Sequence, residues 1–145
     1  MMAQGARGKS EHFSLRMATP VFERLEQRAG QTGEPKSTVA ERYIDEGLKQ
    51  DAHPEIVFRD GPFGRRAMLA GTRLDVWQVI ETLRNSGNSL EDAADYLTLS
   101  LPKARACLAY YAAYQDEVDR YASRVREANE QAEAAWRREQ ELIGA

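Results

Sequence analysis

A short alternating segment is the strongest constraint on how this chain can fold. Residues 12–17 read HFSLRM. The polar residues are His12, Ser14 and Arg16, and the apolar residues are Phe13, Leu15 and Met17. This alternation predicts a β-strand, although the residues that follow it have helical spacing. Because a lone strand leaves its backbone donors and acceptors unpaired, the sequence predicts a strand partner from elsewhere.

Residues 11–51 are expected to contain this strand and two helices joined by a glycine turn. Thr19 is the expected N-cap of the first helix, Pro20 suits its first helical position, and Gly30 and Gly33 are expected to end it. Ser37 is the expected N-cap of the second helix. The predicted apolar stripes are Phe22, Leu25 and Ala29 in the first helix and Val39, Ala40, Tyr43, Ile44 and Leu48 in the second.

A unit of about 40 residues is at the lower limit for independent folding without disulfides, metal or oligomerisation. Pairing with a second copy supplies both a strand partner and a larger core. The two strands would form an antiparallel ribbon with its apolar face on four helices and its polar face outward. A two-stranded ribbon fits the major groove of B-DNA.

Residues 11–51 therefore resemble a ribbon-helix-helix domain, in the alternating strand, the TGEPKS turn and the VAERYIDEGL helix. The resemblance implies a homodimer that binds operator DNA. It assigns base contacts to His12, Ser14 and Arg16, and phosphate contacts to Lys36, Ser37 and the amide of Thr38. Arginine is the favoured reader of guanine, and helix N-termini bind phosphate. The alternative is an amphipathic edge strand with a solvated polar face.

A second module is expected to follow, with DGPFG as the turn of a hairpin. Asp75 is the expected cap of a helix that stops before Gly87, and Ser89 with Asp92 resembles a capping box for a short helix. Ser100 is the expected cap of a final helix, with Pro102 in its first turn. This order is helix-turn-helix-like. Trp77, Tyr110, Tyr111 and Tyr114 are interpreted as core or interface residues.

Residues from about 56 to 117 are similar to the domain of unknown function of VapB-type antitoxins. The matching features are Gly-Thr-Arg-Leu at 71–74, Gly87 with Ser89, Tyr96 with Leu99, and a Tyr-Ala run at 110–113. A structural or protein-binding role is the favoured interpretation. DNA contacts by Lys103 and Arg105 are the alternative. For the basic patch of Arg65, Arg66 and Arg73, contact with DNA backbone is weighed equally against solvation or pairing with the acids Glu91, Asp92 and Asp95.

The last helix is expected to run from Leu101 to about Leu142, because no Gly or Pro follows Pro102 before that point. At 1.5 Å per residue it would reach about 60 Å. Its heptad-like stripe predicts either a homodimeric coiled coil or a segment that docks on a toxin. The resemblance implies a PIN-like ribonuclease as that toxin. The candidate toxin-binding residues are Val125, Trp136, Arg124, Arg126, Arg137 and Arg138. For any single arginine, pairing with a glutamate four residues away is the favoured interpretation, whereas for the tail as a whole partner binding and self-association are weighed equally.

Composition limits the function classes. The 145 residues are 42% hydrophobic and 30% charged with a net charge of −3, which indicates a globular chain with at most a local nucleic-acid contact. The single cysteine and the absence of a signal-type segment favour a cytoplasmic location. His12 and His53 have no metal-type spacing, and no catalytic constellation is present. We therefore expect no enzyme, no cofactor, no metal and no membrane partner.

Together these features predict a mainly α protein with short β segments (α+β). The predicted parts are a tail at 1–10, a ribbon-helix-helix domain at 11–51, a hairpin and helix-turn-helix-like module at 52–116, and a helical tail at 117–145. The predicted function is that of a type II antitoxin that neutralises a PIN-like ribonuclease and represses its own operon. The alternative is a stand-alone repressor whose C-terminal part dimerises or senses a ligand.

Overall fold

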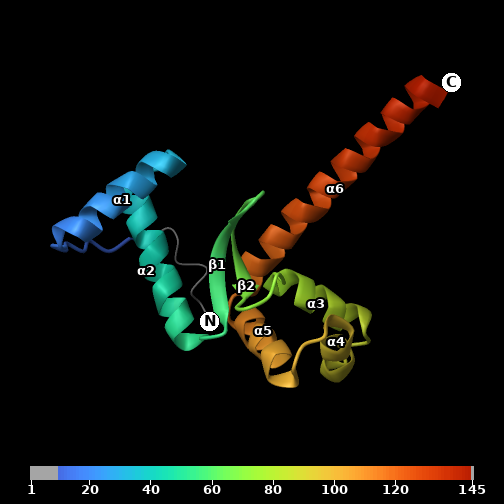
Figure 1. Ribbon diagram of the computed structural model, residues 1–145, viewed down its shortest axis with the longest axis horizontal. Coiled ribbons are helices and arrows are strands. Elements are labelled where there is room, and N and C mark those ends of the chain that lie inside the picture. Colours follow the sequence, from blue (N-terminus) through green and yellow to red (C-terminus); the bar gives the residue numbers. More distant parts are fainter. Residues whose placement is uncertain (1–9, 145) are drawn as a thin grey trace. The chain divides into compact units, whose positions relative to one another are not determined.

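The computed structural model describes residues 10–144 (Figure 1). These residues form six helices and one two-stranded antiparallel sheet, a mainly helical α+β arrangement. The chain divides after Ala52 into two compact units, which we call the N-terminal unit and the C-terminal module. The strand expected at residues 12–17 is not paired with any other described residue, so residues 10–18 precede the first helix without regular structure.

The N-terminal unit contains helices α1 (Thr19–Thr32) and α2 (Lys36–Ala52). Thr19 is the first residue of α1 and not its cap, so the prediction of Thr19 as N-cap is wrong. Ala18 occupies the cap position, and its carbonyl accepts hydrogen bonds from the amides of Val21 and Phe22. Pro20 was predicted at the first helical position and is instead the second residue of α1, but it still lies in the first turn, where the N–H that proline lacks would be unpaired.

The turn between α1 and α2 is made by Gly33, whose φ of 73° lies in the left-handed region that glycine adopts without steric cost. Its amide donates to the carbonyl of Ala29. Gly30 was expected to help end α1, but the helix continues through it because a glycine in an α conformation weakens a helix without stopping it. Ser37 is also not an N-cap, since α2 begins one residue earlier.

The hairpin predicted from DGPFG is confirmed. Strand β1 (Ile56–Gly61) pairs antiparallel with β2 (Gly64–Leu69), and Phe58 lies opposite Ala67 in the register. Two residues connect the strands, and Gly64 has a φ of 113°. Such short connections need positive φ angles, which explains the glycine at the end of the turn.

The three caps predicted from the sequence of the module are confirmed. Asp75 caps α3 (Val76–Asn85), and its amide donates to the side chain of Gln78 at 2.8 Å. Ser89 caps α4 (Leu90–Leu97), and Ser100 caps α5 (Leu101–Ala113) with its Oγ accepting from the amide three residues later. Helix α3 ends before Gly87, as expected. The order α3, α4, short turn, α5 is the helix order that the sequence predicted.

The prediction of one continuous helix from residue 101 to 142 is wrong. Helix α5 ends at Ala113, and α6 (Gln115–Gly144) begins after Tyr114, whose φ of −134° and ψ of 46° are not helical. The ring of Tyr114 lies 4.9 Å from that of Tyr110 and 5.9 Å from that of His53. Aromatic packing therefore accompanies a break that no glycine or proline marks. The 30 residues of α6 span about 45 Å.

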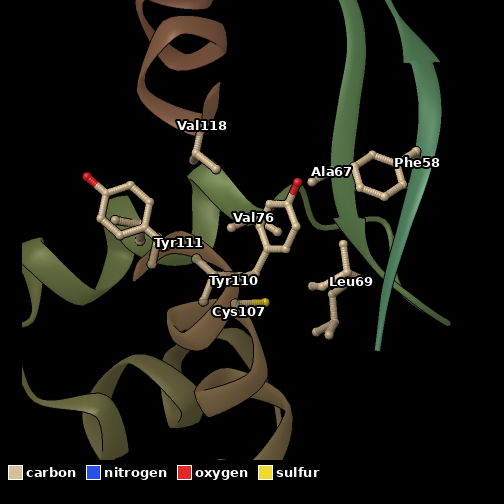
Figure 2. Close-up of a cluster of buried hydrophobic side chains, with 11 residues drawn as sticks. Phe58, Ala67, Leu69, Val76, Cys107, Tyr110, Tyr111 and Val118 are labelled. Atoms are coloured by element: carbon tan, nitrogen blue, oxygen red, sulfur yellow. The ribbon is translucent and has the colours of Figure 1, made fainter. Parts of the chain in front are cut away.

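The core of the module is built around Tyr110, which is fully buried. Figure 2 shows its ring between Val76 of α3 and the two strands. The buried cluster comprises Ile56, Phe58, Ala67, Leu69, Val76, Val79, Ile80, Cys107, Tyr110, Tyr111 and Val118, with Trp77 and Tyr114 packed against it. The expectation that Trp77 and these tyrosines are core residues is confirmed. Because Val118 belongs to α6, the base of the long helix is part of this core.

Candidate interaction surfaces

The segment before α1 presents both faces of its alternating pattern to solvent. His12, Ser14 and Arg16 are exposed, and the His12 Nε2 lies 3.0 Å from the Ser14 Oγ. Phe13 is 76% exposed and Leu15 is 57% exposed. An apolar face this open is unfavourable in water, because burying one such side chain is worth about 1.5–3 kcal/mol. The segment therefore has the composition of a strand but no surface of its own chain to cover it among the described residues.

The helices of the N-terminal unit also leave their large apolar side chains exposed. The exposed residues in these helices are Val21, Phe22, Tyr43, Ile44 and Leu48. The buried ones are Ala29, Val39 and Glu46, which provide little apolar volume. The predicted stripes are thus present in both helices, but half of their members are exposed. This unit therefore leaves several large apolar side chains in contact with solvent, and such groups mark an interaction site when they form one patch.

The candidate phosphate-binding residues lie together in the first turn of α2. Lys36, Ser37 and Thr38 are all exposed, and no acidic residue occupies this turn. The Lys36 Nζ lies 3.2 Å from the Glu26 Oε2 and 4.9 Å from the centre of the Phe22 ring. Both charged groups are about half exposed, so the ion pair is weak and a phosphate can compete for the lysine.

The basic patch predicted around the hairpin is largely neutralised by pairing. Arg65 pairs with Asp60 at 3.2 Å, and the Nε of Arg66 donates to the Asp75 Oδ1 at 2.9 Å. The other oxygen of Asp75 accepts from the indole N–H of Trp77 at 2.9 Å. Arg66 therefore joins β2 to the start of α3 and has a structural role. Arg73 is exposed.

The helix-turn-helix-like part of the module has an acidic outer surface on α4. Glu91, Asp92 and Asp95 are exposed there, next to Tyr96, which is 80% exposed. On α5, Arg105 is exposed and Lys103 is half-buried. Three carboxylates beside two basic groups would repel a phosphate backbone. This distribution favours a protein-binding or structural role over DNA binding for the module.

The base of α6 is fixed to the module by polar contacts as well as by packing. The Tyr110 hydroxyl donates to Glu117 at 2.6 Å, and the Tyr111 hydroxyl donates to Asp119 at 2.8 Å. Arg84 of α3 donates to the Tyr111 hydroxyl at 2.5 Å. Val118, Tyr121 and Ala122 of α6 are buried. The cut between module and tail that the sequence placed at residue 117 thus falls inside this packed region.

The tip of the hairpin makes a second attachment to α6 that the sequence did not reveal. The Arg124 Nη1 donates to the carbonyl of Phe63 at 3.2 Å, and the rings of Phe63 and Tyr121 lie 6.2 Å apart. A Cβ added to Gly61 would overlap the Tyr121 hydroxyl and the Arg66 guanidinium. Gly61 was the only available signal, because a glycine inside a strand often marks the close approach of another segment.

The candidate toxin-binding residues are spread along α6. Arg124 touches the hairpin, and Val125 is half-buried. Trp136 is 58% exposed, far along the helix from the core residues. Arg126 and Arg138 are exposed, and Arg137 pairs with Glu133 four residues earlier at 2.5 Å. The pairing with glutamate that the sequence offered as an alternative therefore holds for Arg137.

Cys107 has no features of a reactive thiol. It is fully buried, and burial together with the negative charge of Glu55 raises its pKa to about 12. Because the thiolate is the reactive form, the thiol is inert at neutral pH. Among residues 10–144, no group of three or more His, Cys, Asp or Glu side chains is placed to hold a metal ion. Within the same range, no helix has the length and apolar character needed to cross a bilayer.

Comparison with known proteins gives one match. Residues 56–111 match the model of a family described as "Protein of unknown function (DUF433)". The matched segment begins at the first residue of β1 and ends within α5, so it covers the hairpin, α3 and α4. It includes neither the N-terminal unit nor α6. No curated protein and no solved structure was found to match the chain.

Proposed function

We propose that this protein is the antitoxin of a type II toxin–antitoxin pair. In this proposal the N-terminal unit forms a ribbon-helix-helix homodimer that binds operator DNA and represses the operon. The C-terminal module and α6 bind and neutralise a PIN-like ribonuclease. The observation that carries the proposal is the exposed apolar face of the N-terminal unit, which includes Phe13, Leu15, Ile44 and Leu48.

The proposal of DNA binding depends on how a second copy would cover the apolar residues of the N-terminal unit. If the two segments at residues 12–17 pair antiparallel, Phe13, Leu15 and Met17 are covered by the helices. The opposite face then carries His12, Ser14 and Arg16, all exposed in the single chain. A ribbon with this face enters the major groove, where arginine reads guanine by two hydrogen bonds. The first turn of α2 supplies amides and Lys36 for the flanking phosphate.

Substitution of Arg16 tests this part. Arg16→Ala is expected to weaken binding to the DNA upstream of the gene by about 1–3 kcal/mol, roughly 5- to 150-fold, and to relax specificity. Arg24→Ala is the matched control, because Arg24 is also exposed but lies on α1 and hydrogen-bonds the carbonyl of Pro20. Fluorescence anisotropy with operator and scrambled duplexes measures both effects. Equal affinity of Arg16→Ala and the unsubstituted protein would exclude the ribbon as the reader.

The toxin-binding part rests on the length and exposure of α6. Beyond Ala122 the helix has no further buried residue among those described, yet it carries Val125 and the exposed Trp136. Four arginines lie along the same part of the helix, namely Arg124, Arg126, Arg137 and Arg138. A guanidinium can occupy the position of a cation between carboxylates, so these arginines suit the acidic, Mg²⁺-binding site of a PIN-like nuclease.

Co-purification with the product of the adjacent gene tests this part. We expect a small nuclease to co-purify with the full chain and its RNA cleavage to be inhibited. Trp136→Glu is expected to lower the affinity at least tenfold, because it places a charge in an apolar contact. Ala134→Glu, on another face of the same helix, is the control and is expected to bind normally. An adjacent product that neither binds the chain nor cleaves RNA would refute the antitoxin proposal.

One observation favours the alternative function, a stand-alone repressor whose C-terminal part dimerises. The distal part of α6 combines exposed apolar residues with a regular 3–4 spacing, as in self-associating helices. Retention of operator binding and repression in the absence of any protein partner would support this alternative.

A further inference from the structure

The face of α6 that enters the module continues as an apolar stripe after the module ends. Val118 and Tyr121 are buried in the core, and the same 3–4 spacing leads on along the helix. We call the continuation the α6 seam, and its residues are Val125, Ala128, Ala132, Ala135, Glu139 and Leu142. Trp136 and Ile143 adjoin the seam and are 58% and 78% exposed, and Leu142 is 85% exposed. Large apolar side chains in this state require a partner.

The charges of distal α6 are placed away from the seam. Glu139 is the one charged residue within it. The residues that point to the other side in a heptad are Arg126, Glu127, Glu130, Glu133, Arg137 and Glu141. The ion pair between Glu133 and Arg137 lies on that outer side. A helix whose regular seam holds a single charged residue and whose outer face is highly charged is suited to lie against another helix.

The position of Glu139 distinguishes two ways of pairing with a second copy. In a parallel pair, Glu139 would face Glu139 of the other copy, and like charges at a buried position are destabilising. In an antiparallel pair centred between Glu133 and Ala134, Val125 faces Leu142 and Ala132 faces Ala135. Glu139 then faces Ala128, one helical turn from Arg124, so the carboxylate has an opposite charge within reach.

The tip of the β1–β2 hairpin offers a contact surface for the end of the second helix in the antiparallel pair. An open groove of about 330 Å³ lies between the tip and α6, lined by Phe63, Arg124, Glu127, Ala128 and Gln131. In the antiparallel register, the end of the second helix with Leu142 and Ile143 reaches the level of residues 124 and 125. These two exposed residues would therefore meet the exposed edge of Phe63 and the apolar end of the groove.

We propose that the α6 seam pairs antiparallel with the α6 seam of a second copy of this chain. The small alanines at its centre allow the two helix axes to approach closely, and the larger residues pack at both ends. A further consequence rests on the proposed antitoxin function. Because the toxin would use Val125 and Trp136 of the same stripe, toxin binding and α6 pairing exclude each other, and the toxin must displace the second helix.

Disulfide cross-linking in the full chain tests the pairing and its direction. The double variant Val125→Cys/Leu142→Cys places two cysteines opposite each other across the proposed pair, within the distance that a disulfide needs, and it keeps Glu139. Within one chain they are 17 residues apart on a helix and cannot bond. Cys107 does not interfere, because it is buried and its pKa is raised to about 12. Arg126→Cys/Glu141→Cys is the control, at the same level but on the outer side.

We expect mild oxidation to shift most of the Val125→Cys/Leu142→Cys protein to twice its monomer mass, and little of the control. Proteolytic peptides should be joined between positions 125 and 142. Bonds joining 125 to 125 and 142 to 142 would show a parallel pair and overturn the proposed register. Equal cross-linking of both variants, or none of either, would overturn the pairing.

The competition is tested separately with the product of the adjacent gene. If that protein binds, its addition before oxidation should reduce the 125–142 product, and an unchanged yield would refute the competition. If it does not bind the unsubstituted chain while the 125–142 product forms, the antitoxin proposal fails and the pairing stands. Ala132→Glu, which places a charge in the seam, should abolish pairing in the cross-linking variant, whereas Ala134→Glu should not.

Discussion

The two units of this chain are both mainly helical, but they treat their large apolar side chains in opposite ways. The C-terminal module encloses Tyr110, Leu69 and Val76 in one continuous core. The N-terminal unit buries Ala29 and Val39 and leaves its larger residues exposed. A unit whose apolar core is buried within one chain is expected to fold alone. A unit as small as the N-terminal one, with its large apolar residues exposed, is expected to bury them against another molecule.

Among substitutions that test this difference between the units, the largest loss of stability is expected in the core of the C-terminal module. Tyr110→Ala should lower the free energy of unfolding by about 3–5 kcal/mol, because it removes a fully buried aromatic ring. Tyr96→Ala is the matched control, since Tyr96 is 80% exposed and its removal should cost less than about 0.5 kcal/mol. Urea unfolding followed by circular dichroism measures both. Similar losses for the two tyrosines would contradict a core centred on Tyr110.

The next effect is expected in the N-terminal unit and depends on association. Ile44 is half exposed in one chain, so Ile44→Asn should be nearly neutral if the unit works alone. If a second copy covers it, each copy loses about 1.5–3 kcal/mol and the dimer dissociates at higher concentration. Analytical ultracentrifugation over a dilution series measures the dissociation constant. Glu41→Asn, at an exposed polar position of the same helix, should leave the constant unchanged.

A smaller loss of stability is expected on breaking the ion pair between Arg66 of β2 and Asp75 at the start of α3. Asp75→Ala removes the partner of both Arg66 and Trp77 and should destabilise the module by about 1–3 kcal/mol. Asp95→Ala, at an exposed site on α4, serves as its control. Thermal unfolding should show the difference as a lower midpoint for Asp75→Ala alone. Two identical midpoints would mean that the ion pair has no structural role.

The smallest effect is expected at the first turn of α2. Lys36→Ala should weaken binding to every duplex similarly and lower the slope of log affinity against log salt by about 1. The reason is the loss of one phosphate contact without loss of base reading. Anisotropy titrations at several salt concentrations measure the slope. A change confined to the operator would mean that Lys36 reads bases instead.

In the C-terminal module, the features that depend on neighbouring residues were predicted correctly, whereas a feature that depends on packing between distant residues was missed. Asp75, Ser89 and Ser100 were recognised as caps because a cap is determined by residues within one turn of it. The hairpin was recognised because its turn has a characteristic composition. The break at Tyr114 was missed, since it involves packing against Tyr110 and His53 and not a glycine or proline.

The candidate sites show the same limit. The pairing of Arg66 with Asp75 has no local signal, because the two residues meet only after β2 and α3 have packed together. The sequence therefore left open whether Arg65 and Arg66 are paired, and it did not identify Asp60 and Asp75 as their partners. Thr19 and Ser37 looked like caps, but the helices begin at these residues or just before them. The strand predicted at residues 12–17 has no partner strand among residues 10–144.

The most direct test of the central claim, that a second copy completes the N-terminal unit, is hydrogen exchange of the full chain at several concentrations. Amides of residues 12–17 and of α1 and α2 should become more protected as the concentration rises, because pairing buries the strand and the open apolar face. Amides of the core in β1, β2, α3 and α5 should not change. Protection of the N-terminal unit that is independent of concentration would contradict the claim.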